Sequence, residues 1–396
     1  MDTIAILIPS LKKGGAEKQA VLLKNALSDH YHVYFILFNA ELGHEQELIE
    51  LGHLDDDHLV KLQGSLVGKL WHLHKILRKH KVRALFTYLT APNFFGSLIG
   101  RMVGVPNIYT GMRSACLESS KRFFEKVASR MATKVIANSH AGELFFNKYG
   151  VKNTCTISNC YINFHYVSTR TERQTVGIVT VARFTEEKDY YTALKSVQRL
   201  RDEGLAIHYT IIGYGTLEAQ IRGWIKELGL QDTVSVVINP KNIFGYLEQQ
   251  DIYLSTSLFE GTSNSVMEAL DAELPVVATD AGDNKYLVID GQNGFIHSAG
   301  DVEGISMSLK RLAMSGTLRE KFGKRGKNLL RENHSMERFR QSYLNLLKSS
   351  RNIPEPISIT VLTMRQTRQH HDGSKKRWLK SGAMHLVWRS YVNSKQ

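Results

Sequence analysis

The chain contains 396 residues, of which 42% are hydrophobic and 22% charged, so its composition is that of a soluble globular protein long enough for two domains. Its apolar stretches fall short of the roughly 18–20 residues that a membrane-spanning helix needs, and its first residues lack the order of a signal peptide. The formal net charge of +13 permits an anionic partner, and three cysteines without metal-ligand spacing favour a reducing, cytoplasmic compartment.

Strand-like and helix-like segments alternate along the chain. The apolar runs typical of buried strands are TIAILIP, HVYFILF, RALFTYL, KVIANS, TVGIVTVAR, IHYTIIG, TVSVVI, DIYLSTS and PVVATD. Apolar residues recur at helical spacing in 16–27, 66–80, 190–202 and 217–228, and again near 302–331 and 336–349. Apolar strands separated by amphipathic helices predict parallel sheets with helices on both faces.

A polar, turn-rich stretch at 162–174 separates two such alternating regions. We therefore predict an α/β protein with two Rossmann-like, doubly wound parallel-sheet domains, at 1–165 and 170–350. Beyond residue 350 the periodicity fails. Residues 351–396 contain nine Lys or Arg and two Asp or Glu, so +7 of the net charge lies in this basic tail.

The first loop with a ligand-binding pattern is IPSLKKGGAEKQA, in which Gly14 and Gly15 stand between a strand and a helix. Glycines at such a turn let the backbone come close to a ligand and turn the N–H groups of the helix start towards it. The Walker A pattern is absent from this loop. A plain connecting loop is the alternative.

A basic amphipathic segment follows at 118–132. It repeats apolar residues every four positions, at Phe123, Val127 and Met131, beside a row of cations at Arg122, Lys126 and Arg130. Such a helix can lie on anionic lipid. A domain helix with a solvated basic face explains the same pattern.

Two cations flank the loop after the first strand of the second region. In VARFTEEKDY, Arg183 and Lys188 lie five positions apart between a strand and a helix. A guanidinium fork and an ammonium at the carboxyl end of a strand suit a diphosphate. The alternative is two solvated cations paired with Glu186 and Glu187.

A second glycine pair occurs in IIGYGTLEAQI, where Gly213 and Gly215 follow a strand and precede a helix. This is the first half of a dinucleotide-binding fingerprint, but Glu218 stands where the third glycine would be. The pattern predicts a tight turn that can approach a ligand, and it disfavours a Rossmann dehydrogenase.

Two glutamates mark the stretch LFEGTSNSVMEALDAELPVVATDAG. Glu260 lies in the loop after a strand, and Glu268 lies one to two turns into the next helix. The free N–H groups of a helix start favour an anion such as phosphate, and carboxylates accept hydrogen bonds from the paired hydroxyls of sugars and ribose. A capping box formed by Ser265 and Glu268 is the alternative.

Together these stretches resemble the retaining nucleotide-sugar glycosyltransferases of family 4, which have the GT-B fold of two Rossmann-like domains facing a central cleft. The resemblance covers roughly residues 1–349. It is carried by the E-x7-E spacing from Glu260 to Glu268, by Arg183 with Lys188 in the family's GR..xEK setting, and by GGAEK in the acceptor-side glycine loop.

The resemblance implies a role for each matching residue. Arg183 and Lys188 would bind the donor diphosphate, Glu260 would bind hydroxyls of the transferred sugar, and Glu268 would bind the ribose. The backbone of Asn264, Ser265 and Val266 would hold phosphate, the amides of Gly14 and Gly15 would approach the diphosphate, and Gly213 would lie in the donor-binding turn. The family needs neither a metal nor a cofactor.

The chain departs from the family pattern in two places. Many members carry a histidine in an N-domain loop, whereas this chain reads NIYTGMRSA, so Arg113 becomes a candidate catalytic contact to the donor. The usual GG-x-x-E reads Gly282, Asp283, Asn284, Lys285 and Tyr286 here, which removes a family-typical glutamate.

The implied function is transfer of a sugar from a UDP-, GDP- or similar nucleotide-sugar to a lipid-linked or saccharide acceptor, in cell-surface polysaccharide or glycolipid assembly. The implied location is cytoplasmic, with peripheral contact with an anionic inner membrane face. A nucleotide-sugar 2-epimerase of the same architecture is one alternative. A basic nucleic-acid-binding protein is another, and no nucleic acid is expected because the excess charge lies in the tail rather than on a patterned face.

Overall fold

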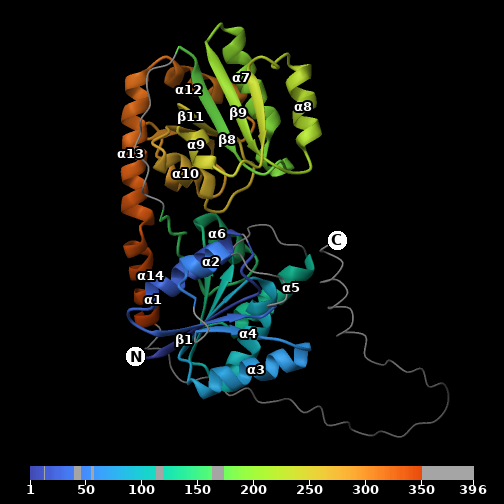
Figure 1. Ribbon diagram of the computed structural model, residues 1–396, viewed down its shortest axis with the longest axis vertical. Coiled ribbons are helices and arrows are strands. Elements are labelled where there is room, and N and C mark those ends of the chain that lie inside the picture. The colour runs from blue at the N-terminus through green and yellow to red at the C-terminus, as the bar shows by residue number, and fades with distance from the viewer. Residues whose placement is uncertain (13, 40–45, 55–57, 113–118, 163–173, 350–396) are drawn as a thin grey trace, which may run out of the picture. The chain divides into compact units, whose positions relative to one another are not determined.

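The computed structural model describes residues 1–349 apart from 13, 40–45, 55–57, 113–118 and 163–173. These residues form two parallel β-sheets with helices packed on them (Figure 1). The described part of the first sheet has seven strands in the order β3-β2-β1-β4-β5-β6-β7. They are β1 (Thr3–Ile8), β2 (His32–Leu37), β3 (Leu59–Lys61), β4 (Ala84–Tyr88), β5 (Asn107–Met112), β6 (Lys134–Ala137) and β7 (Thr154–Thr156).

Helices cover both faces of this sheet, as the sequence predicted. They are α1 (Gly15–Leu27), α2 (Gln46–Leu51), α3 (Leu66–Lys79), α4 (Thr90–Val103), α5 (Ser119–Met131) and α6 (His140–Lys148). Alternate residues of β1 belong to two separate cores. Ile4 and Ile6 pack in the core that contains α1, and Ala5 and Leu7 pack in the core that contains α3 and α4. A strand buried on both faces reads as a continuous apolar run, which explains TIAILIP.

The second sheet has the order β10-β9-β8-β11-β12-β13. Its strands are β8 (Val176–Val181), β9 (Ile207–Gly213), β10 (Val234–Ile238), β11 (Ile252–Ser255), β12 (Val276–Thr279) and β13 (Gly294–His297). The helices of this domain are α7 (Tyr190–Asp202), α8 (Glu218–Glu227), α9 (Ile243–Leu247), α10 (Asn264–Asp271), α11 (Asn284–Leu287), α12 (Val302–Ala313) and α13 (Gly316–His334). The chain therefore has the two-domain, doubly wound α/β architecture that its sequence predicted.

The last helix, α14 (Met336–Ser349), packs on the first domain rather than the second. Phe339 and Tyr343 belong to the first domain's core, where Tyr343 lies edge-on to Phe86 at 5.6 Å between ring centroids. Arg340 Nε donates to the carbonyl of Ala26 at 3.1 Å. The predicted range 170–350 for the second domain therefore needs a correction after α13, because the apolar face of α14 is buried against α1.

Four strands were missing from the sequence prediction, namely β3, β5, β7 and β13. The strand β5 lies in the stretch NIYTGMRSA, which we expected to be a loop. Its residues Asn107, Thr110 and Gly111 interrupt the apolar pattern although all three are buried. The other three strands have only three or four residues and carry too few side chains to show a period.

The strand order places the candidate site. In the second sheet, β8 pairs with β9 on one side and with β11 on the other. The chain runs outward from β8 through β9 to β10 and then crosses to β11 on the opposite side of β8, so the strand order reverses there. Ligands bind outside the carboxyl ends of the strands at such a switch point. The loops that follow β8 and β11 carry Arg183, Lys188 and Glu260. Within the described ranges, no helix is long and apolar enough to cross a membrane.

Candidate functional site

Lys188 and Glu260 form the centre of the candidate site. Lys188 ends the 3₁₀ turn Glu186–Lys188 after β8, and its Nζ lies 2.5 Å from Glu260 Oε1 in the loop after β11. The hydroxyl of Ser257 donates to the same oxygen at 2.9 Å. Each side chain of the ion pair is only 13% exposed. The pair is therefore partly shielded from water, where an ionic interaction is stronger than at the surface.

Backbone contacts fix the two loops to each other. The Thr256 hydroxyl donates to the carbonyls of Lys188 and Asp189 at 3.0 and 2.9 Å, and the N–H of Leu258 donates to the carbonyl of Glu187 at 2.8 Å. Asp189 has a φ of 46° and caps α7 by accepting from the N–H of Thr192. The loops are thus held before any ligand arrives, which is the preorganisation that electrostatic catalysis needs.

Arg183 lies in the same loop but outside this ion pair. Its side chain is 67% exposed, and its Nη2 lies 3.4 Å from Glu187 Oε1. This is the pairing that the solvated alternative predicted for the arginine. Lys188, by contrast, pairs with Glu260 rather than with a neighbouring glutamate.

Helix α10 begins at Asn264, with Ser263 as its N-cap residue and no side-chain capping bond. Ser265 lies inside the helix, so the capping-box alternative for Ser265 and Glu268 is wrong. Val266 is fully buried and anchors the first turn in the core. Burial raises the pKa of Glu268 to about 7, and the positive charge of Lys18 opposes this rise. A buried carboxyl group with a raised pKa is a candidate functional group.

The glycine loop of the first domain meets the start of α10. Gly14 is the N-cap residue of α1, and a β-carbon on Gly15 would lie 3.2 Å from Nδ2 of Asn264. Asn159 Nδ2 donates to Oδ1 of the same Asn264 at 3.4 Å. The starts of α1 and α10 therefore face one region, and the dipoles of the two helices favour an anionic ligand there.

Lys18 is a site residue that the sequence analysis missed. It lies in the first turn of α1, and its charge acts on Glu268, which follows it by 250 positions in the chain. The GGAEK stretch placed a lysine directly after the glycine loop. The periodicity did not show that this turn would face α10.

Gly213 ends β9 beside the loop of Arg183. A β-carbon there would lie 1.9 Å from the carbonyl oxygen of Ala182, and one on Gly215, whose φ is 154°, would lie 2.5 Å from the carbonyl oxygen of Phe184. The glycines therefore let the loop after β8 fold against β9. Arg113, the other candidate catalytic residue, lies outside the described residues.

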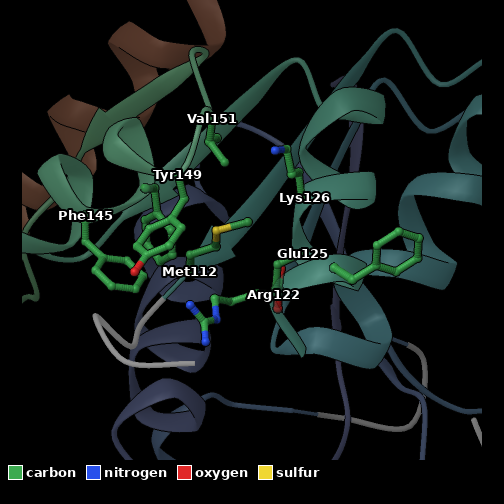
Figure 2. Close-up of a pocket in the computed structure, with 9 residues that line it drawn as sticks. Met112, Arg122, Glu125, Lys126, Phe145, Tyr149 and Val151 are labelled. Atoms are coloured by element: carbon green, nitrogen blue, oxygen red, sulfur yellow. The ribbon is translucent and has the colours of Figure 1, made fainter. Parts of the chain in front are cut away.

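The first domain contains a cavity of about 140 Å³ beside α5 and α6 (Figure 2). It is lined by Met112, Arg122, Phe123, Glu125, Lys126, Phe145, Phe146, Tyr149 and Val151. The wall is mostly apolar. The guanidinium of Arg122 lies 5.4 Å from the centroid of the Tyr149 ring. Glu125 accepts from Asn93 Nδ2 at 2.9 Å, and burial raises the pKa of this carboxyl group.

The cations of α5 lie where an anion can reach them. Lys126 and Arg130 are exposed, as is the ring of Phe123 at 65%. The cavity thus combines an apolar wall with a positively charged rim. Within the described chain, no group of three or more His, Cys, Asp or Glu could hold a metal ion.

Residues 168–329 match the family described as glycosyl transferases group 1. The fold is that of HepE from Anabaena in its crystal structure with UDP, with a TM-score of 0.73, 17% identity, and coverage of 88% of this chain and 100% of HepE. The chain has the GT-B fold, and its second domain belongs to the group 1 glycosyl transferases. The matched residues include Arg183, Lys188, Gly213, Glu260 and the 264–268 segment, whereas Gly14 and Gly15 lie outside them.

Two curated relatives extend the comparison of this glycosyltransferase. It is 35% identical to the amylovoran biosynthesis glycosyltransferase AmsK of Erwinia amylovora over 148 residues, which are 35% of this chain and 36% of AmsK. It is 23% identical over 353 residues to the N-acetylgalactosamine-N,N'-diacetylbacillosaminyl-diphospho-undecaprenol 4-alpha-N-acetylgalactosaminyltransferase of Campylobacter jejuni, covering 83% of this chain and 94% of that enzyme.

Proposed function

We propose that this glycosyltransferase moves a sugar from a nucleotide-diphospho-sugar to an acceptor hydroxyl with retention of configuration and without a metal ion. Its place would be in surface polysaccharide or glycolipid assembly. The observation that carries the proposal is the Lys188–Glu260 pair beside two converging helix starts. The resemblance to AmsK, an amylovoran biosynthesis enzyme, supports the polysaccharide setting.

The negative charge that develops on the leaving diphosphate would account for the cations at the candidate site. Breaking the bond between sugar and phosphate builds negative charge on the diphosphate. Lys188, Arg183 and the N–H groups at the starts of α1 and α10 would stabilise that charge from fixed positions. The crystal structure of the structurally similar HepE in complex with UDP supports a nucleotide as part of the donor.

Glu260 is proposed to bind the transferred sugar rather than to attack it. Both of its described donors, Lys188 and Ser257, bind Oε1, so Oε2 can accept from a sugar hydroxyl. A carboxylate that accepts two hydrogen bonds is a weakened nucleophile. Retention would then follow from attack on the same face of the sugar, with the leaving phosphate as base.

The acceptor would approach from the first domain. We expect an acceptor linked to an anionic lipid, because the cavity beside α5 pairs an apolar wall with Arg122 and Lys126 at its rim (Figure 2). The name of the Campylobacter relative contains a diphospho-undecaprenol acceptor, which supports this choice. The enzyme would then work at the cytoplasmic face of a membrane.

The proposal is tested by a thermal-shift screen against UDP-, GDP- and ADP-sugars, followed by product analysis. A nucleotide-sugar that binds only the folded state raises the melting temperature. One nucleotide class should stabilise the protein, and its sugar should appear on an added acceptor with unchanged anomeric configuration. Failure of all three classes to stabilise the protein would overturn the proposal, and conversion of the sugar at C2 without an acceptor would favour the epimerase.

A further inference from the structure

Asp283 of the second domain caps a helix of the first domain. Its Oδ2 accepts from the N–H of His140 at 3.0 Å and lies 3.2 Å from Nδ1 of the same residue. Its Oδ1 accepts from the N–H of Ala141 at 3.1 Å. The Asp283 side chain is only 3% exposed. The carboxylate therefore binds the first two N–H groups of α6, where the helix dipole favours a negative charge.

Helix α6 also has a cap within its own domain. Ser139 accepts from the N–H of Gly142 through its side chain and from Glu143 through its carbonyl, each at 3.0 Å. The two remaining N–H groups of the first turn are those that Asp283 binds. The start of α6 is therefore fully bonded only when the two domains are together.

The backbone at Asp283 is joined to the loop of Glu260. The N–H of Asp283 donates to the carbonyl of Gly261 at 3.1 Å. Gly282 has a φ of 59°, and a β-carbon there would lie 2.4 Å from the carbonyl oxygen of Glu260. From the other side, the Thr262 hydroxyl donates to the carbonyl of Asn138. Residues 260–262 are thus held between the Asp283 turn and the segment that leads into α6.

Tyr286 also contacts His140 through its aromatic ring. The two rings are stacked with centroids 4.2 Å apart and an interplanar angle of 29°. Tyr286 stands three positions after Asp283, at the place where the related family usually has a glutamate. One short turn therefore contacts His140 through a carboxylate and an aromatic ring.

We propose that Asp283 is a positioning residue that makes the placement of Glu260 depend on the contact between the two domains. When the domains meet, the carboxylate binds α6 and the same turn fixes the backbone of Glu260 and Gly261. When they part, both carboxylate oxygens lose their amide donors and the loop of Glu260 loses one of its two supports. The inference rests on the proposed donor-sugar role of Glu260.

The test uses Asp283→Ala with Asp301→Ala as a matched control. Asp301 caps α12 by accepting from the N–H of Gly304 at 2.9 Å and lies 3.5 Å from Nδ1 of His297, so it makes the same kind of cap inside one domain. Hydrogen–deuterium exchange is measured on the intact protein for peptides that cover 138–143 and 258–263. Steady-state transfer is measured with the nucleotide-sugar identified by the thermal-shift screen.

Asp283→Ala should raise exchange in both peptides and lower kcat/KM by roughly 10- to 100-fold, while Asp301→Ala leaves both unchanged. Asp283→Asn keeps an amide oxygen for the helix start and should recover part of the loss. Unchanged exchange over 258–263 in Asp283→Ala would overturn the inference. Stabilisation of Asp283→Ala by the nucleotide identified in the thermal-shift screen separates this outcome from failure of the proposed function, because the proposed nucleotide contacts are Arg183, Lys188 and Glu268.

Discussion

Lys188 and Glu260 are 72 positions apart in the chain, yet their charged atoms meet in the site at 2.5 Å. The contact joins the loops that follow β8 and β11 at the switch point of the second sheet. In the proposed complex it would hold a cation for the diphosphate and a carboxylate for the sugar in one unit. A donor that binds there would need little rearrangement of either side chain.

Glu260→Gln and Lys188→Ala should each lower kcat/KM for transfer by about 10²–10³-fold, because each removes a charged group that contacts the donor in the proposed complex. Loss of one partner also leaves a shielded charge unpaired, which lowers the free energy of unfolding by about 1–3 kcal/mol. The control is Lys310→Ala, whose ion pair with Glu203 at 2.7 Å is exposed. Initial rates and circular dichroism check the result, and transfer at the wild-type rate by both site variants would refute the assignment.

The pKa of Glu268 predicts a pH-dependent donor affinity. Burial raises this pKa from 4.5 to about 7. The ionised carboxylate accepts from both ribose hydroxyls, whereas the neutral acid must use one oxygen as a donor. The KM for the donor should therefore fall as the pH rises from about 6 to 8, and Glu268→Gln should abolish this dependence. A parallel pH profile for the variant would contradict the ribose role.

The same shift affects stability with a definite sign. Between pH 4.5 and about 7 the folded protein keeps a proton on Glu268 that the unfolded chain has released. The retained proton contributes to the free energy of unfolding. Its contribution is complete below pH 4.5 and is lost as the pH rises through about 7, by at most about 1.4 kcal/mol per pH unit. Urea unfolding of wild type and Glu268→Gln from pH 5 to 8 measures the difference, which should grow with pH in favour of the variant.

Lys18→Ala should move the titration of Glu268 upwards, since the charge of Lys18 lowers the pKa of this carboxyl group. The pH at which the donor KM changes should rise above its wild-type value. Lys24→Ala, on the last turn of the same helix, is the control. An unchanged midpoint in Lys18→Ala would show that α1 does not act on Glu268 in solution.

Gly213→Ala should destabilise the second domain, because a β-carbon would overlap the carbonyl oxygen of Ala182 at 1.9 Å. Overpacking of this kind costs typically about 1–3 kcal/mol. Gly223 in α8 has nothing within 4 Å of the same position, so Gly223→Ala should instead raise stability by about 0.5–1 kcal/mol. Chemical denaturation compares the two, and equal midpoints would show that the loop after β8 relaxes freely.

The membrane proposal predicts salt-sensitive binding to anionic vesicles. Lys126→Glu with Arg130→Glu reverses two exposed charges on α5 and should abolish co-sedimentation with phosphatidylglycerol liposomes at low salt. The matched control is Lys324→Glu, an exposed lysine in the second domain. Equal sedimentation of the two variants would place any lipid contact elsewhere.

The two-domain α/β architecture and the candidate ligand-binding loops could be predicted from the residue pattern alone. Strands such as TIAILIP are buried on both faces and so read as unbroken apolar runs, and the helices between them show their period. Glycines, cations and carboxylates at the ends of those strands marked the candidate site because backbone approach and charge are local properties. The short edge strands β3, β7 and β13 and the polar strand β5 escaped prediction since they lack a clear period.

Which of those residues lie together depends on the packing of the two domains. The tertiary structure pairs Lys188 with Glu260 and leaves Arg183 with Glu187. Ser265 lies inside α10, and the charge of Lys18 lowers the pKa of Glu268. Asp283 accepts a hydrogen bond from the start of a helix 143 positions away. Helix α14 likewise packs in the core of the first domain, although it follows the second domain in the chain. Such contacts depend on how whole elements pack, and no local pattern of residues records that packing.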